Sequence, residues 1–542
     1  MKGERNYWMG VWGQRLSRRQ ALRSAARASI GLAGLSLLSC APTARQAPAV
    51  KAVPETVVFA FQENPASLDP HLDLGRGAVA LHIHMYDGLY RYDNEYNVWP
   101  GLAQSFKLLN DLTWEFKLRA GIKFHNGEDF NAEVVRFNVE RHQDAASKSR
   151  MIADFNDITK VEVIDPSTVR IVTKAPNPIV HHKFLQGLIV PMQYVKEKGQ
   201  GALTTQPVGT GAYKFIRWVK DEIIELEANE NYWGWQKGGP FEKSGHIKKL
   251  VYRPIPEQGS RIAALKTGEI DLFHNISADF YKAVRENPDL DILESPAATQ
   301  PMIVISQLKE GPLRDKRVRQ ALNYAVDVGT IIKNIMGGVP LRNASFTGPS
   351  TKLSYDPNLK PYPYDPKKAK DLMAAAGYPN GFEVVFDNPE LGHDKQNEIV
   401  QAVAEYLGQV GVKTRIVPHS RAENYRAKAK TDGSGPVGIM YDTSYTPTGD
   451  PDFTLWQKVH SKGVANFGYY DRAVADKLIE DARSTMDPEK RKKAYLEVTR
   501  LFYDDPPCIF LWEPKYTFAY NKKKLPALRV IQWMPAFYDY SV

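Results

Sequence analysis

The stretch SRIAALKTGEIDLF, residues 260–273, places a helix directly before a strand. We expect the helix to run from Ser260 to Gly268 and the strand to follow at 270–273. Short β-branched segments at 56–61 and 168–172 predict strands as well. Because helices and strands alternate along most of the chain, the sequence predicts the α/β class.

Further helices are predicted in the second half of the chain. Apolar residues within 318–325 follow the spacing of one helical face. Asp365 and Asp487 each precede a proline, which is typical of an N-cap and a first helical residue. Another helix is expected from about Asp394 to Gly411, and an apolar strand at 506–511.

The composition is that of an ordinary globular protein. The chain has 542 residues, of which 43% are hydrophobic and 25% are charged. This balance excludes a disordered chain, a collagen-like chain and a multi-span membrane protein, and the length suggests about three or four domains. Two cysteines are too few for a disulfide scaffold. We expect one of them, Cys508, to fill the buried strand.

The net charge of +9 is concentrated at the N-terminus. Residues 1–39 contain seven basic side chains and one acidic side chain, so they carry most of the excess. Nucleic-acid binding requires basic residues clustered on the folded part of a chain. The charge distribution therefore predicts that nucleic acid is not a partner.

The N-terminal segment has the features of an export signal. Arg18-Arg19 precedes an apolar run at 28–38 that is too short to cross a bilayer. The paired arginines resemble a twin-arginine signal, and Leu37–Cys40 resembles a bacterial lipobox. These resemblances imply a signal peptide at 1–39 and lipidation of Cys40, with a flexible tether at 40–53.

The sequence offers little catalytic or cofactor chemistry. It contains no zinc-protease helix, nucleophile elbow or phosphate-binding loop. Gly209-Thr210-Gly211 lacks the third glycine of a dinucleotide fingerprint and indicates a turn beside a strand. His82 and His84 would share one face of a strand, but two ligands without an acidic pattern favour polar packing over a metal site. We therefore predict no enzyme activity, no cofactor and no metal.

Several segments resemble the family 5 extracytoplasmic solute-binding proteins of ABC importers, which serve oligopeptides, dipeptides and nickel chelates. The longest match joins Trp114–Arg119, Gly121–Gly127 and Asn131–Val135. The matches follow the family's order and cover essentially all of 55–520. The others lie at 67–70, 85–89, 207–213, 229–233, 317–327, 375–382 and 449–452.

The resemblance implies a two-lobed periplasmic-binding-protein fold, type II-like with three domains and a hinged ligand cleft. Lobe 1 is expected at 54–300, with an extra domain at about 91–206, and is completed by 508–542. Lobe 2 is expected at 301–507. The segment at 85–89 is expected to be a helix. The chain would cross between the lobes near residues 300 and 508.

The resemblance also implies where a solute would bind. In peptide binders of the family, an aspartate shortly before the Gly-Asp-Pro-Asp element commonly holds the peptide's amino terminus. Pro447 occupies the position where the dipeptide-binding type has this acid, so Asp442 is the candidate replacement. The segment before residues 85–89 borders the cleft in relatives. The candidate ligand contacts are Tyr441, Asp442, Tyr445, His84 and Arg76.

The function implied is capture of a peptide or a similar small polar solute outside the membrane, and its delivery to the permease subunits by lobe closure. Nickel chelates, opines and sugars remain alternative solutes. A solute sensor or chaperone on the same fold is an alternative role. A secreted hydrolase is a further alternative, although its catalytic motif is missing. We expect a monomeric lipoprotein held at the membrane in the periplasm or an equivalent extracytoplasmic space.

Overall fold

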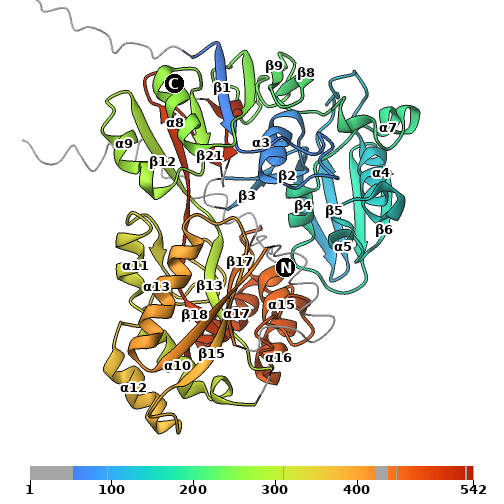
Figure 1. Cartoon of the computed structure of the whole chain (residues 1–542). Coiled ribbons are helices and arrows are strands. Elements are labelled where there is room, and N and C mark those ends of the chain that lie inside the picture. The colour runs from blue at the N-terminus through green and yellow to red at the C-terminus, as the bar shows by residue number, and fades with distance from the viewer. Residues whose placement is uncertain are drawn as a thin grey trace, which may run out of the picture. The chain divides into compact units, whose positions relative to one another are not determined.

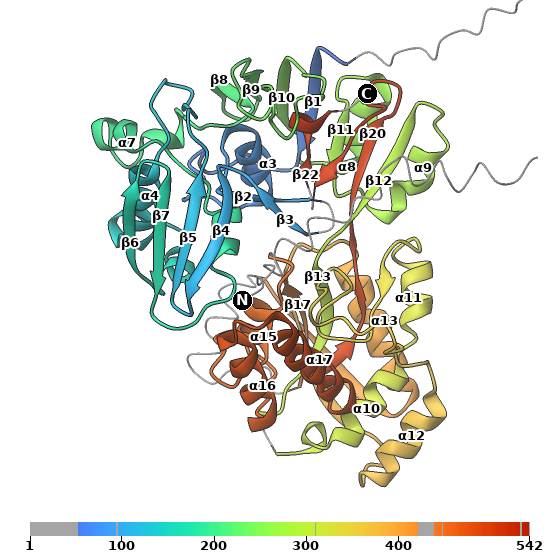
Figure 2. The same ribbon diagram turned by 180° about the vertical axis from the view of Figure 1, so that it is seen from behind.

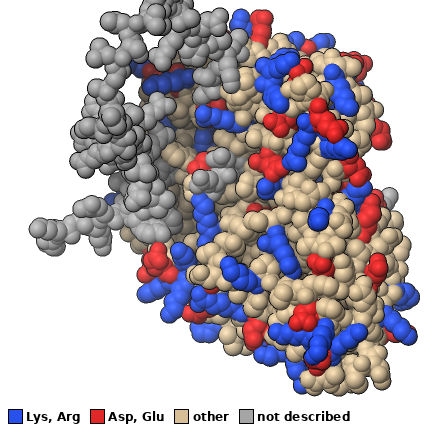
Figure 3. All heavy atoms as spheres, turned by 90° about the vertical axis from the view of Figure 1, so that its left-hand side faces the viewer, with Lys and Arg blue, Asp and Glu red and all other residues tan. Residues whose placement is uncertain are grey.

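The computed structural model describes residues 53–93, 96–308, 310–420, 438–446, 448–531 and 534–540. Residues 51–542 form one compact unit. The predicted signal peptide, Cys40 and nearly all of the tether lie outside the described residues. Within the described ranges, no helix combines the length and the apolar character needed to cross a membrane. Lys and Arg side chains are interspersed with Asp and Glu over the face in Figure 3.

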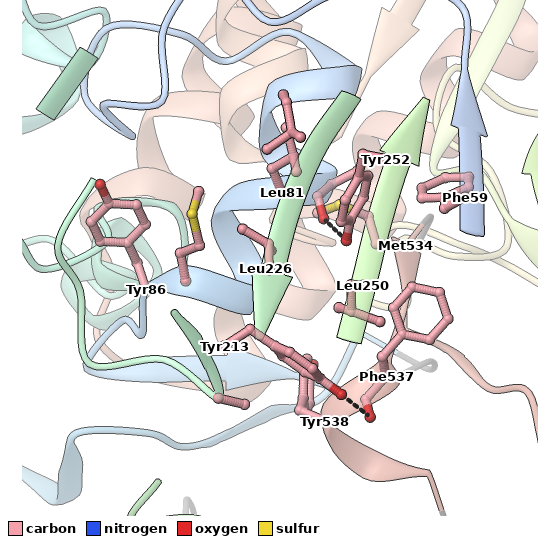
Figure 4. Close-up of a cluster of buried hydrophobic side chains, with 14 of the residues drawn as sticks. Phe59, Leu81, Tyr86, Tyr213, Leu226, Leu250, Tyr252, Met534, Phe537 and Tyr538 are labelled. Carbon is pink, nitrogen blue, oxygen red and sulfur yellow. Dashed lines mark hydrogen bonds between the residues drawn. The ribbon is translucent and has the colours of Figure 1, made fainter. Parts of the chain in front are cut away.

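A seven-stranded mixed sheet forms part of the first lobe and lies at the top of the molecule in Figures 1 and 2. Alternate residues of β1 (Thr56–Phe61) face opposite sides of this sheet. Phe59 packs with α3 (Arg76–Met85) in the core shown in Figure 4, whereas Ala60 packs with α8 (Gln258–Thr267). In spatial order the strands are β12 (Leu290–Pro296), β20 (Lys515–Asn521), β11 (Leu272–His274), β1, β10 (Lys249–Pro254), β9 (Ile223–Ala228) and β8 (Tyr213–Val219).

A four-stranded antiparallel sheet belongs to the same lobe and has its own core. Trp114 and Phe116 of its β5 pack against Val135 and Val139 of α4. This sheet lies within the range of the expected extra domain. Its strands in order are β4 (Ala103–Asn110), β5 (Thr113–Leu118), β7 (Thr168–Thr173) and β6 (Ile158–Asp165), and its helices are α4 (Ala132–Gln143), α5 (Ile152–Phe155), α6 (Val180–Gln186) and α7 (Met192–Lys198).

A five-stranded sheet forms the second lobe, and helices cover both of its faces. Ile303 of β13 packs with α10 and α13, whereas Val304 packs with α16 and α17. The strands in order are β16 (Val412–His419), β15 (Phe382–Pro389), β17 (Ile439–Tyr445), β13 (Thr299–Ile305) and β18 (Cys508–Phe510). The helices are α10 (Lys316–Ala325), α11 (Val328–Asn334), α12 (Pro366–Ala375), α13 (Gln396–Gln409), α15 (Asp452–Lys458), α16 (Ala473–Ser484) and α17 (Pro488–Asp504).

Short elements complete the chain. The strand pairs are β2 (Tyr90–Tyr92) with β3 (Val98–Pro100), β14 (Leu341–Arg342) with β19 (Trp512–Glu513), and β21 (Val530–Ile531) with β22 (Met534–Pro535), and α9 spans Tyr281–Arg285.

The predicted caps and the α/β class are confirmed. The Asp365 side chain accepts a hydrogen bond from the Lys368 amide, and Asp487 accepts bonds from the amides of Glu489 and Lys490. Cys508 lies fully buried in β18. Helices and strands alternate along the described chain, as the opening stretch indicated.

Two expectations are corrected. The helix expected at 85–89 is instead α3, which ends at Met85; Tyr86 is extended, and residues 86–89 are not helical. The segment 508–510 pairs with β13 inside the second lobe and does not complete the first lobe. The return to the first lobe occurs between β19 and β20, at Pro514.

Candidate functional site

Two chain segments join the lobes and lie against each other. Residues 297–298 connect β12 to β13, and Pro514 connects β19 to β20. The Ala297 amide donates a hydrogen bond to the Pro514 carbonyl oxygen, 3.3 Å away. Strands β12 and β20 run antiparallel up to this point, where Pro296 pairs with Lys515. The crossovers therefore form a paired connection of the kind about which lobes hinge.

Tyr96, Tyr445 and Tyr516, here called the tyrosine cluster, gather beside these crossovers. The Arg76 guanidinium carbon lies 5.3 Å from the centre of the Tyr516 ring. The Tyr96 hydroxyl donates to the Pro296 carbonyl at 3.3 Å. Desolvation and Tyr516 raise the pKa of Tyr445, whereas Arg76 and a hydrogen bond from Gln186 oppose the rise. The structure thus brings together two sequence-predicted residues, Arg76 of the first lobe and Tyr445 of the second.

Glu513 places a buried carboxylate at the same crossover. Its side chain accepts hydrogen bonds from the hydroxyl and the amide of Ser350 and from Gln300 Nε2, which lies 3.3 Å from Oε2. Among the described residues, no Lys, Arg or His forms an ion pair with it. Burial therefore raises the pKa of Glu513, although the Ser350 and Gln300 hydrogen bonds oppose the rise.

A glycine provides the space for this carboxylate. A Cβ atom at Gly348 would lie 1.8 Å from Glu513 Oε2.

The charge of Glu513 also acts on the tyrosine cluster, through Tyr96. Desolvation raises the pKa of Tyr96, and Tyr516, Tyr445 and Glu513 raise it further. The crossover region therefore combines aromatic rings, one buried carboxylate and one exposed guanidinium.

Tyr441 and Asp442 make their side-chain contacts within the second lobe. Both lie on β17 with 1% of their surface exposed. The Tyr441 ring belongs to the second-lobe core, and its hydroxyl lies 3.2 Å from His393 Nδ1. Asp442 forms an ion pair with Lys458 at 2.5 Å. Pro447 lies outside the described residues. The charge of the candidate replacement acid is thus balanced within the second lobe.

His84 is placed in the core of the first lobe. Its Nδ1 lies 2.8 Å from the Ala80 carbonyl and 3.1 Å from the Tyr252 hydroxyl, and its ring stacks on Phe537. Burial lowers its pKa to about 4. Because it sits inside α3, the expectation that His82 and His84 share one face of a strand is wrong. Within the described residues, no group of three or more His, Cys, Asp or Glu is placed to hold a metal ion.

Sequence reasoning missed Glu513, Tyr516 and Tyr96. A charged residue that follows the apolar run at 506–511 after one tryptophan was the available signal for Glu513. Tyr96 lies beside the Gly-Asp-Pro-Asp element, because a Cβ at Gly449 would come within 2.9 Å of the Tyr96 Cβ. The sequence did not predict this contact, which spans both lobes.

The sequence model of the bacterial extracellular solute-binding proteins, family 5, matches residues 97–466. The chain belongs to this family. The glutathione-binding protein GsiB of Escherichia coli K12 is 28% identical over 520 residues, which cover 93% of this chain and 96% of GsiB. Among solved structures, NikZ from Campylobacter jejuni in complex with Ni(L-His) is 26% identical, with a TM-score of 0.71, and the match covers 90% of this chain and 100% of NikZ.

Comparison with solved structures agrees with the assignment of the chain to family 5. HbpA2 from Haemophilus parasuis, at 24% identity, has a TM-score of 0.79 over 90% of this chain and 99% of its own. The expected periplasmic-binding-protein fold is confirmed. The family 5 protein described here is the solute-binding component of an ABC import system and works outside the cytoplasm with a membrane permease. Its relatives are solute-binding proteins and not enzymes.

Proposed function

We propose that this solute-binding protein captures a short peptide or a peptide-like solute at the tyrosine cluster. The observation that carries the proposal is the presence of two opposite charges at one cluster. Glu513 is buried without an ionic partner among the described residues, and Arg76 is exposed. A peptide has an ammonium group and a carboxylate, and can offer an opposite charge to each. GsiB is named for glutathione, itself a tripeptide.

Glu513 is suited to an ammonium group because its surroundings leave its charge unbalanced. Neutral donors satisfy its oxygens. Desolvation of an unpaired carboxylate costs several kcal/mol, and a bound cation would offset part of that cost. Asp442 is less suited, because Lys458 already balances it.

Arg76 is suited to bind the carboxylate of such a solute, and the tyrosine rings are suited to contact its remaining surface. Arg76 lies at the first position of α3, where its guanidinium faces the Tyr516 ring. Guanidinium groups bind carboxylates with two parallel hydrogen bonds. Tyr445 retains 38% exposure, so its ring has surface available for a ligand.

Closure of the lobes would bury the solute. Polar contacts already link them: Lys352 donates to Asn97 Oδ1 at 3.0 Å, and Lys395 pairs with Asp279 at 2.6 Å. Hinge bending at residues 297–298 and Pro514 would separate these pairs without disturbing either sheet. Water exclusion in the closed state would strengthen the ionic contacts.

A thermal-unfolding screen tests the solute class. Purified, ligand-free protein would be mixed with reduced glutathione, trialanine, nickel–histidine or maltotriose. A solute at 100 times its dissociation constant adds about 2.7 kcal/mol of stability. We expect stabilisation by a peptide and its reduction in Arg76→Gln. Stabilisation by nickel–histidine or the sugar alone would overturn the peptide assignment.

We further propose that the protein is a monomer, exported through the twin-arginine route and anchored by a lipid on Cys40. The paired arginines and the lipobox-like Leu37–Cys40 support this arrangement. A lipid anchor followed by a tether would hold the binding lobes close to the permease.

A further inference from the structure

A pocket lies in the first lobe, apart from the tyrosine cluster. It has a volume of about 540 Å³ and lies between the chain after β5 and the chain after β9, with β8 along one wall. Figure 1 shows the positions of these strands. Residues 119–127, which include part of the longest family match, supply one side. Neither Arg76, Glu513 nor the tyrosine cluster lines it.

The lining carries charge of one sign. Arg119, Lys123, Lys214 and Lys237 line the pocket, and no Asp or Glu does. Lys123 pairs with Asp129 at 2.7 Å. The other three cations have no ion pair within the described part of the chain. Concave sites lined by charge of one sign concentrate ions of the opposite sign.

The Arg119 side chain is held in place by contacts that leave its terminal nitrogens available. Its Nε donates to the Gly101 carbonyl at 2.7 Å. Its guanidinium carbon lies 4.7 Å from the centre of the Trp233 ring, which also lines the pocket. Within the described residues the two terminal nitrogens have no acceptor. A guanidinium fixed in this way loses little freedom when it binds a planar or tetrahedral anion.

Two nearby acidic groups, Asp87 and Glu242, are engaged elsewhere. The Asp87 carboxylate accepts hydrogen bonds from Arg91 and from Trp233 Nε1, each at 2.8 Å, and Glu242 accepts one from the Gly238 amide at 2.9 Å. His125 adds no charge at neutral pH, because burial lowers its pKa to about 4. The pocket lining therefore keeps an excess of positive charge, although Glu227 lies opposite Lys214 in the β8–β9 pair.

We propose that this pocket binds a small anion with two or more negative charges, carried by phosphate or carboxylate groups. Its volume lies within the range of small-molecule sites, and its walls are polar rather than apolar. The site is distinct from the proposed peptide site, because the two share no residues.

The test is calorimetric titration of the purified protein with inorganic pyrophosphate at low ionic strength. We expect one-site binding that weakens at least about 10-fold in Arg119→Gln combined with Lys214→Gln. Lys220→Gln is the matched control, since Lys220 lies in the turn after Lys214 on the same hairpin and does not line the pocket. Raising the salt concentration should weaken binding.

A second variant and a glutathione-binding control complete the experiment. If the double variant unfolds, the single Lys214→Gln variant replaces it, because the Lys214 side chain forms no hydrogen bond or ion pair with a described residue. Binding of reduced glutathione should be the same in wild type and variant, so failure of the peptide proposal would leave this result interpretable. No saturable pyrophosphate binding, equal weakening by Lys220→Gln, or binding only to anionic phospholipid vesicles would overturn the proposal.

Discussion

The Ala297 amide donates a hydrogen bond to the Pro514 carbonyl oxygen at 3.3 Å, so the two segments that join the lobes are tied to each other. The two lobes are therefore joined through one paired connection. Glu513 immediately precedes Pro514, and Tyr516 follows two residues later. A solute that contacts these side chains would sense the angle between the lobes directly, which connects binding with closure.

Replacing Gly348 by alanine should weaken binding of a peptide's amino group. The added Cβ would lie 1.8 Å from Glu513 Oε2 and 2.6 Å from Gln300 Nε2, so the carboxylate must move. We expect a loss of affinity close to that of Glu513→Gln, measured by calorimetry. Gly259→Ala is the matched control, since nothing lies within 4 Å of its added Cβ. Unchanged affinity in Gly348→Ala would count against the role of Glu513.

Peptide affinity should depend on acid pH through Glu513. Burial raises the pKa of this carboxyl, so it loses its charge at a higher pH than an exposed glutamate does. Affinity should be constant near neutrality and fall as the pH drops through the raised pKa. Titrations from pH 4.5 to 7.5 should show this fall in the wild type and a smaller one in Glu513→Gln. Parallel curves would exclude Glu513 as the titrating group.

The ion pair between Asp450 and Arg491 should be a major element of second-lobe stability. The two side chains make paired hydrogen bonds, one of them 2.7 Å long, and both are buried. Removal of one partner of a buried pair costs about 3–5 kcal/mol. Arg491→Met should therefore lower the free energy of unfolding by that amount, whereas Lys493→Met, on the exposed side of α17, should change it little.

The same pair has a defined pH dependence. Desolvation acts to raise the pKa of Asp450, but Arg491 holds it below its usual value. The pair's contribution is therefore complete above the unfolded pKa of about 3.9 and is lost as the pH falls through the lower folded value. Denaturant titrations of wild type and Arg491→Met should converge only in this acid range. Convergence near neutral pH would contradict the assignment.

His84 should destabilise the fold in mild acid. Burial lowers its folded pKa to about 4, whereas the unfolded imidazole titrates near 6.5. The unfolded chain therefore takes up a proton first, and stability falls between about pH 6.5 and 4 by up to about 1.4 kcal/mol per pH unit. His84→Phe should make this fall shallower in denaturant titrations. An unchanged slope would show that His84 does not titrate as described.

Cys40→Ser should release the protein from the membrane. Without the thiol no lipid can be attached, so the mature protein should move from the membrane fraction to the soluble extracytoplasmic fraction. Cell fractionation and palmitate labelling measure the change, and Cys508→Ser is the matched control, since Cys508 is fully buried. Retention of the Cys40→Ser protein at the membrane would contradict lipid anchoring.

Local features were predicted well from the sequence, and long-range ones were not. Asp365 and Asp487 were identified because a cap depends on the adjacent residues. The helix α3 was missed because its N-cap is Gly75, which makes no side-chain hydrogen bond, and because His82-Ile83-His84 resembles a strand.

The candidate site was also difficult to predict, because it depends on contacts between residues that are distant in the sequence. Arg76 and Tyr445 were named from the family resemblance, but their meeting beside Tyr516 depends on both crossovers. Glu513 was missed because its burial and lack of a cation depend on Ser350, Gln300 and Gly348, which are distant in sequence.

The most direct test of peptide capture is a thermodynamic cycle measured by calorimetry. Reduced glutathione and its N-acetylated form would each be titrated into wild type and Glu513→Gln. We predict at least about 10-fold weaker binding of the acetylated form to wild type, and a much smaller difference in Glu513→Gln. Equal binding of both forms to wild type, or an undiminished difference in Glu513→Gln, would contradict an ammonium group bound at Glu513.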